Sequence, residues 1–216
     1  MEWTENIIIA DADYVDNVAF NLTVNFERMI GRRIPPADMA RWVECIALDG
    51  GMRPTSTIGS APDACPITTQ VVLIHDDGQQ RMENFMPGDY AELHGKAFTG
   101  NLGEFMFCCT SPSGITTKAA LLKETLELAC QTAEVRRIMV VPGEDGIDDV
   151  RRVLRHSLSK LGHSSLEKQR EQGLDITVFT MQPVAGGRDF SQEMLGYSLM
   201  AALGVKSSEL NPESQG

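Results

Sequence analysis

An apolar run at residues 7–10, made of three isoleucines and an alanine, constrains the fold of this chain more than any other feature. The run is short and β-branched, and Asn6 and Asp11 bound it, which favours a buried strand over a helix. In alternating α/β proteins, ligands and metals bind at the carboxyl ends of buried parallel strands. The sequence therefore predicts a core strand that leads directly into a candidate site containing Asp11 and Asp13.

Asp13 and Asp16 have a second interpretation, as caps of the following helix. Residues 15–30 carry apolar side chains at helical spacing, and Gly31 is placed to end that helix. A carboxylate at the start of a helix accepts hydrogen bonds from its first free amides. Both interpretations stay open for these two residues, whereas Asp11 is better explained as a site residue.

The composition predicts one domain outside the membrane. A chain of 216 residues with 42% hydrophobic residues can bury one core, so we expect a single α/β domain over residues 1–205, with an irregular loop at 52–69 and a polar tail at 206–216. No stretch approaches the roughly 18 apolar residues of a membrane-spanning helix. The acidic first residues lack the pattern of an export signal, which favours a cytoplasmic location. Five cysteines without a CxxC pair suggest neither a zinc ribbon nor a disulfide framework.

The net charge of −11 limits the partners that the chain can bind. Nucleic-acid binding draws much of its affinity from lysine and arginine, so a broad nucleic-acid surface is not expected. A small phosphoester or a short nucleic acid held locally remains compatible with this charge.

Short apolar runs alternate with helical patterns along the chain. We expect strands at 7–10, 70–75, 104–109, 137–141 and 175–181, and helices at 15–30, 35–48, 89–94, 116–133, 147–161 and 190–203. Thr117 is placed to cap the helix at 116–133. The turn at residues 76–78 predicts a hairpin with a weaker strand at 81–85.

This alternation specifies a three-layer, doubly wound α/β domain with a mainly parallel, Rossmann-like sheet. The carboxyl rim of that sheet would gather polar residues that follow the strands: Asp11, Asp13, Asp76, Asp77, Thr110, Ser111, Glu144 and Asp145. Clustered carboxylates bind hard cations such as magnesium.

The order of these elements, with the segment Val140-Val141-Pro142-Gly143-Glu144-Asp145, resembles the PIN-like nucleases of the NYN type. Those proteins open with a strand ending in aspartate and carry a Ser-Gly-Asp-x-Asp-Phe motif after a later strand. The resemblance implies magnesium held by Asp11, Glu144 and Asp145, which would activate a water molecule against a phosphodiester. Here Pro142 replaces the serine of that motif, and residues 115–117 lack the aspartate usual before the long helix.

The segment Asp11-Ala12-Asp13-Tyr14-Val15 resembles the first motif of the haloacid-dehalogenase-type phosphohydrolases, Asp-x-Asp-x-Thr/Val. That resemblance implies that Asp11 attacks phosphorus and that Asp13 handles protons. Thr110 or Ser111 would supply the second motif, residues 143–149 the acidic loop, and Lys118 or Lys123 the family's lysine.

Longer stretches of the chain resemble a bacterial protein family to which no activity is attached. They are residues 11–14, 18–33 and 195–204. Three hypotheses for function follow. The chain is a magnesium-dependent phosphodiester hydrolase of the nuclease kind, a phosphohydrolase that attacks through Asp11, or a non-catalytic binding or scaffold protein on a degenerate nuclease fold.

Two features near the carboxyl end bear on ligands and partners. Gly186, Gly187 and Arg188 precede the last helix and predict either an anion-binding site or a flexible turn. The last helix is apolar around its circumference, which indicates either a homodimer formed through that helix or a central position in the fold.

Overall fold

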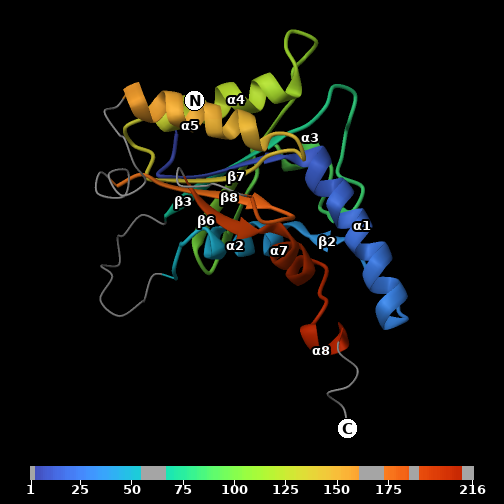
Figure 1. Ribbon diagram of the computed structural model, residues 1–216. Coiled ribbons are helices and arrows are strands. Elements are labelled where there is room, and N and C mark those ends of the chain that lie inside the picture. Colours follow the sequence, from blue (N-terminus) through green and yellow to red (C-terminus); the bar gives the residue numbers. More distant parts are fainter. Residues whose placement is uncertain (1–2, 55–66, 161–172, 185–189, 211–216) are drawn as a thin grey trace.

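The computed structural model describes residues 3–54, 67–160, 173–184 and 190–210. Its centre is a seven-stranded sheet with the strand order β5-β6-β3-β1-β7-β8-β9 (Figure 1). Neighbouring strands pair in parallel except β5 and β6, which are antiparallel. The predicted α/β class with a mainly parallel sheet is therefore confirmed.

The elements lie close to the predicted ranges. The strands are β1 (Asn6–Asp11), β2 (Ala37–Asp38), β3 (Thr68–Ile74), β4 (Phe85–Met86), β5 (Ala97–Gly100), β6 (Gly103–Thr110), β7 (Arg137–Val141), β8 (Asp175–Thr180) and β9 (Ser191–Met194). The helices are α1 (Ala12–Ile30), α2 (Met39–Asp49), α3 (Tyr90–Leu93), α4 (Lys118–Gln131), α5 (Ile147–Lys160), α7 (Leu195–Ala202) and α8 (Ser207–Leu210). Residues 55–66 of the predicted loop lie outside the described residues.

Helices cover both faces of the sheet, which gives three layers. Figure 1 shows α4 and α5 on one face and α2 and α7 on the other. Helix α1 begins at the carboxyl end of the central strand β1 and runs away from the sheet. Alternate residues of β1 serve the two cores: Ile7 and Ile9 pack under α4 and α5, and Ile8 and Ala10 pack on the opposite side. Both faces of the strand are buried, which explains why its sequence is continuously apolar. None of the described helices has the length and apolar character needed to cross a membrane.

The predicted hairpin at residues 81–85 is wrong, because Asp16 holds this segment in another arrangement. The carboxylate of Asp16 accepts hydrogen bonds from the amides of Glu83 at 3.1 Å and Asn84 at 2.8 Å. Phe85 and Met86 then form β4, which pairs in parallel with β2. Burial raises the pKa of Asp16, while the hydrogen bonds from Asn84 oppose that rise.

The predicted helix at 190–203 is wrong in its first part. Residues 191–194 form β9, which extends the sheet beside β8, and the helix begins only at Leu195. Leu195 and Leu199 of this helix are fully buried, and α7 contacts α2 and β8. A central position therefore accounts for much of the apolar character of α7, and the homodimer stays a prediction.

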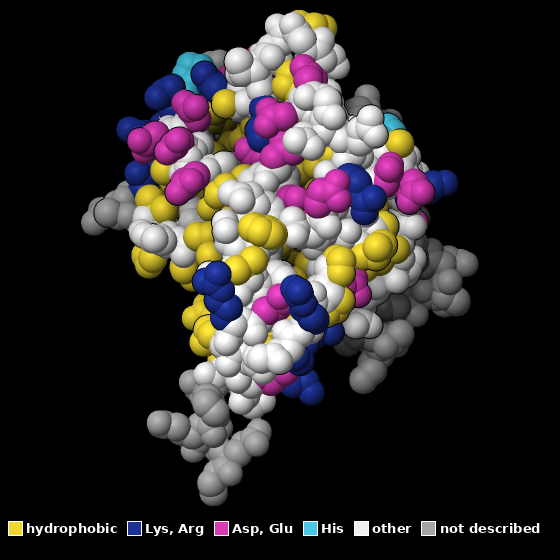
Figure 2. Space-filling view, turned by 90° about the vertical axis from the view of Figure 1, so that its right-hand side faces the viewer, with side chains coloured by type: hydrophobic (Ala, Val, Ile, Leu, Met, Phe, Trp, Pro, Cys, Tyr) yellow, Lys and Arg dark blue, Asp and Glu magenta, His cyan; other side chains and the backbone are white. Residues whose placement is uncertain are grey.

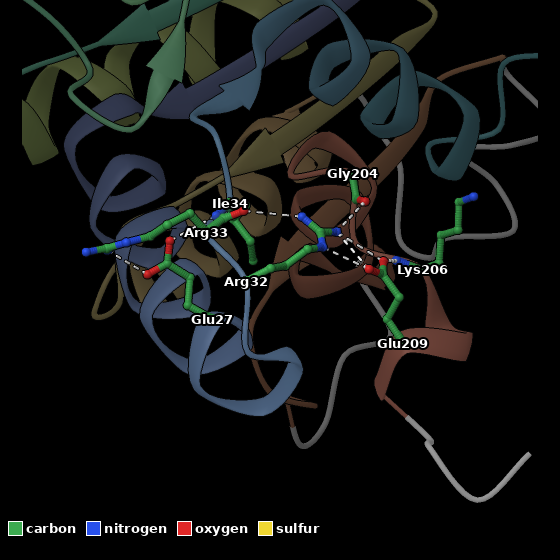
Figure 3. A network of polar contacts seen from close by, with 7 residues as sticks. All are labelled: Glu27, Arg32, Arg33, Ile34, Gly204, Lys206 and Glu209. Carbon is green, nitrogen blue, oxygen red and sulfur yellow. Dashed lines mark hydrogen bonds and ion pairs between the residues drawn. The ribbon is translucent and has the colours of Figure 1, made fainter. Parts of the chain in front are cut away.

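The predicted polar tail begins with the short helix α8, which is attached to the end of α1 (Figure 3). Arg32 donates hydrogen bonds to Glu209 at 2.9 Å and 3.2 Å and to the carbonyl of Gly204 at 3.5 Å. Near the end of α1, Glu27 forms an ion pair with Arg33 at 3.0 Å. The contacts of Arg32 therefore link the end of α1 to the last described part of the chain.

Candidate functional site

The candidate site lies where the carboxyl ends of β3, β1 and β7 meet. From the central strand β1 the chain moves to β3 and β6 on one side of the sheet. Helix α4 then carries it back across β1 to β7 on the other side. In open α/β sheets, ligands bind at such a point, where the order of the strands changes direction. Figure 2 shows acidic side chains gathered in the upper half of the face that it presents, with basic side chains among them.

Asp11 ends β1 and also caps α1. One of its oxygens, Oδ1, accepts a hydrogen bond from the amide of Tyr14 at 3.0 Å, so Asp11 takes the capping role considered for Asp13 and Asp16. Asp13 lies in the first turn of α1, where the helix dipole favours a negative charge. Two carboxylates are thus fixed at the end of the central strand by local backbone geometry.

Lys118 joins these carboxylates into one network. Its ammonium lies 2.9 Å from Oδ1 of Asp11, 2.8 Å from Oδ2 of Asp13 and 3.0 Å from Oδ2 of Asp76. The side chain of Lys118 is only 18% exposed. Burial lowers the pKa of Lys118, but the hydrogen bonds to the three carboxylates outweigh burial and raise it, so the ammonium stays charged at neutral pH.

The position of Lys118 follows from the start of α4. Thr117 caps this helix by accepting a hydrogen bond from the amide of Ala120 at 3.2 Å, as the sequence predicted. Asp77 accepts hydrogen bonds from the amides of Ser113 at 2.8 Å and Gly114 at 2.7 Å and fixes the preceding loop. A hydrogen bond from Ser111, followed by these amides, lowers the pKa of Asp77. Ser111 thus contributes to the loop before α4.

The segment after β3 forms another wall of the site. The amide of Asp76 donates to Oδ2 of Asp13 at 2.7 Å, and the ring of His75 stacks on Tyr90 with centroids 4.0 Å apart. The Tyr90 hydroxyl is buried and has no hydrogen-bond partner within the described part of the chain. Burial and the nearby charges, first that of Asp13, raise the pKa of Tyr90.

The β7–α5 loop brings Glu144 and Asp145 to the same edge. A Cβ atom on Gly143 would lie 2.8 Å from Oδ2 of Asp11, so only glycine permits this approach. Asp11, Glu144 and Asp145 line one cavity of about 310 Å³. The structure thus places the three predicted metal ligands around a common cavity.

The described side chains do not form a finished metal site. Within residues 3–54, 67–160, 173–184 and 190–210, no three His, Cys, Asp or Glu side chains are grouped so that they could hold a metal ion. Lys118 already supplies the positive charge between Asp11, Asp13 and Asp76. The predicted anion site at residues 186–188 lies outside the described residues.

Two further residues of this network had been predicted less directly. Lys118 is one of two lysines that the phosphohydrolase resemblance named, and the structure places it, rather than Lys123, against Asp11. Asp76 was predicted both as a residue of the carboxyl rim and as part of a turn. It lies two residues after the end of β3 at Ile74, the same offset that Asp13 has from the end of β1 at Asp11.

Comparison with known proteins places the chain in a family. No curated protein and no solved structure matches it. A match to a family model covers residues 1–210, nearly the whole chain. The protein therefore belongs to the family of unknown function DUF6621.

Proposed function

We propose that the protein hydrolyses phosphoesters and that Asp11 is the attacking carboxylate. The observation that carries this proposal is the contact between Lys118 and Asp11, in which the ammonium binds Oδ1 and leaves Oδ2 facing Gly143. No hydrogen bond to Oδ2 occurs within the described residues. A carboxylate held through one oxygen presents the other in a defined direction, as nucleophilic catalysis requires.

Lys118 also reduces the repulsion between the carboxylates of the site and an anionic substrate. A phosphoester is anionic, and Asp11, Glu144 and Asp145 would repel it from the cavity that they line. A fixed ammonium beside the nucleophile offsets part of this repulsion and stabilises charge in the transition state. Because its pKa is raised, Lys118 keeps this charge over the whole neutral range.

Asp13 is the proposed proton-transfer group. Its Oδ2 accepts hydrogen bonds from Lys118 and from the amide of Asp76, which leaves Oδ1 for the reaction. The cycle starts with a proton on Oδ1 of Asp13. As Oδ2 of Asp11 bonds to phosphorus, the ester P–O bond breaks, and the leaving oxygen takes this proton and departs as the alcohol. A water molecule then attacks phosphorus, returns a proton to Asp13 and releases phosphate and free Asp11.

Trapping of the acyl-phosphate intermediate tests this proposal. Beryllium fluoride, a mimic of the phosphoryl group on aspartate, should bind the wild type and not Asp11→Asn, and the same substitution should abolish hydrolysis of para-nitrophenyl phosphate. Glu134→Gln, which removes an exposed carboxylate that does not line this cavity, is the control and should keep both binding and hydrolysis. Full activity in Asp11→Asn would refute the role of Asp11, and inactivity of the wild type on every phosphoester would favour a binding or scaffold protein.

A metal-dependent nuclease of the PIN-like type is the second candidate. It is supported by the direct passage from β1 into the long helix α1 and by the common cavity of Asp11, Glu144 and Asp145. Magnesium bound there would supply an activated water molecule. In that case a short single-stranded oligonucleotide would be cleaved only with added magnesium, and beryllium fluoride would bind neither the wild type nor Asp11→Asn.

A further inference from the structure

A second cavity adjoins the candidate site on the far side of the β7–α5 loop. Its volume is about 440 Å³, within the range of small-molecule sites. Pro142, Gly143 and Glu144 line both this cavity and the one beside Asp11. Because these three lining residues are shared, one molecule can contact both cavities at once.

The walls of this second cavity combine apolar and polar groups. The apolar side chains come from four different elements and loops: Tyr14, Pro142, Ile147, Met181, Pro183 and Val184. Glu144, Thr180 and Gln182 add polar side chains to the same lining. The carboxylate of Glu144 repels an anionic group and attracts a cation or a neutral hydrogen-bond donor.

Glu144 gives this cavity a directional polar contact. Its carboxylate has no hydrogen bond or ion pair with any described residue, and a carboxylate accepts hydrogen bonds but cannot donate them. Tyr14 and the exposed Glu144 line the same cavity. Burial, followed by the charge of Glu144, raises the pKa of Tyr14. A ring lying against Tyr14 could donate an N–H group to Glu144.

Hydrogen bonds with β9 hold the far wall of the cavity in place. Gln192 donates hydrogen bonds to the hydroxyl of Thr180 and to the carbonyl of Gln182 at 3.0 Å, and it accepts one from the amide of Val184 at 3.1 Å. These bonds fix the segment 180–184 that lines the cavity. A preformed wall reduces the entropy cost of binding.

We infer that this cavity binds the organic part of the substrate, and that this part is a neutral or cationic ring bearing an N–H donor, such as an amino-substituted nucleobase. The inference rests on the proposed function, because it assumes that the phosphoryl group of the same molecule lies beside Asp11. The substrate class is then a small phosphomonoester whose ring occupies the second cavity.

Binding of nucleosides, which carry no phosphate, tests the inference separately from hydrolysis. Calorimetric titration of the full chain should give a dissociation constant about tenfold lower for adenosine than for purine riboside, which lacks the amino group and has no N–H on its ring system. Cytidine and 3-methyluridine, whose base carries no N–H group, form a second pair with the same difference. Glu144→Gln should remove the preference, and Glu134→Gln, an exposed glutamate at the opposite edge of the sheet, should keep it.

The outcomes separate the two proposals. Failure of both cytidine and adenosine to bind, or binding without preference, would overturn the inference even if phosphoester hydrolysis is found. Selective binding that Glu144→Gln abolishes supports the inference. If the same protein then fails to hydrolyse cytidine 5′-monophosphate, the proposed function is wrong and the ring-binding site stands.

Discussion

Replacement of Lys118 by methionine should destabilise the protein by about 2–4 kcal/mol at pH 7. The side chains of Lys118, Asp11 and Asp13 are 18%, 12% and 23% exposed, so two of the three ion pairs are largely buried. Asp76 is 59% exposed and contributes little. Removal of one partner from a fully buried pair costs about 3–5 kcal/mol and from an exposed pair about 0–1 kcal/mol, and this network lies between those limits. Methionine keeps most of the apolar stem of lysine, so lost packing adds little.

Urea denaturation followed by the fluorescence of Trp42, which is fully buried, measures this change. Lys123→Met on the same helix is the control, because Lys123 forms no ion pair with any described residue. An unfolded lysine loses its proton near pH 10.4, whereas the pKa of Lys118 in the folded protein is higher. At high pH the folded state therefore keeps a proton that the unfolded state has lost, and stability falls as the pH rises further. The difference in the free energy of unfolding between wild type and Lys118→Met should therefore have its full size below about pH 10 and shrink at higher pH. A difference under about 0.5 kcal/mol at pH 7 would refute the view that Lys118 holds the three carboxylates together.

Three further changes test other parts of the structure. Gly143→Ala would place a Cβ atom 2.8 Å from the nearest carboxylate oxygen, so thermal unfolding should report a loss of about 1–3 kcal/mol, and an unchanged midpoint would contradict the close approach. Tyr90→Phe removes a buried hydroxyl without a described partner and should leave stability unchanged or raise it by up to about 1 kcal/mol, whereas a clear loss in urea denaturation would reveal a hidden partner. Glu209→Gln should speed hydrogen exchange of residues 204–210 without changing global stability. The pKa of Glu209 is lowered by the amide of residue 206 and then by Arg32, so its contribution is present above about pH 4.3 and lost at lower pH, where the wild type should exchange like the variant.

The sheet was predictable because its strands are buried on both faces. Residues 7–10, 70–75, 137–141 and 175–181 are short, mainly apolar runs with a polar or charged residue at or next to at least one end, and each corresponds to a parallel strand. Local signals also located Thr117 as a cap and Gly31, with φ of 69°, as the end of α1. These features depend on neighbours within a few residues, which the sequence displays directly.

The errors arose where distant residues decide the structure. Asp16 binds the amides of Glu83 and Asn84, which are 67 and 68 positions away, and no local pattern shows that a carboxylate will prevent the hairpin. Residues 191–194 form a strand only because β8 offers them an open edge. The ion pairs of Lys118 had no local signal either, since its partners lie on two distant segments, at residues 11–13 and at residue 76, and only the strand order brings them to the start of α4.

The same strand order makes residue 118 decisive for the chemistry of the site. Because α4 carries the chain from β6 back to β7, its first turn must cross the carboxyl end of β1, and the helix contacts that strand. A lysine at this position neutralises part of the negative charge of Asp11, Asp13 and Asp76 from within the protein. An acidic residue at the same position would add to that charge, so the folded state would need a cation from solution. Lys118→Asp should therefore be unstable without divalent ions, and magnesium should raise its unfolding midpoint, while Lys123→Asp and the wild type should respond little. A folded Lys118→Asp variant whose midpoint is indifferent to magnesium would mean that these carboxylates do not converge, and the attacking geometry assigned to Asp11 would fail with them.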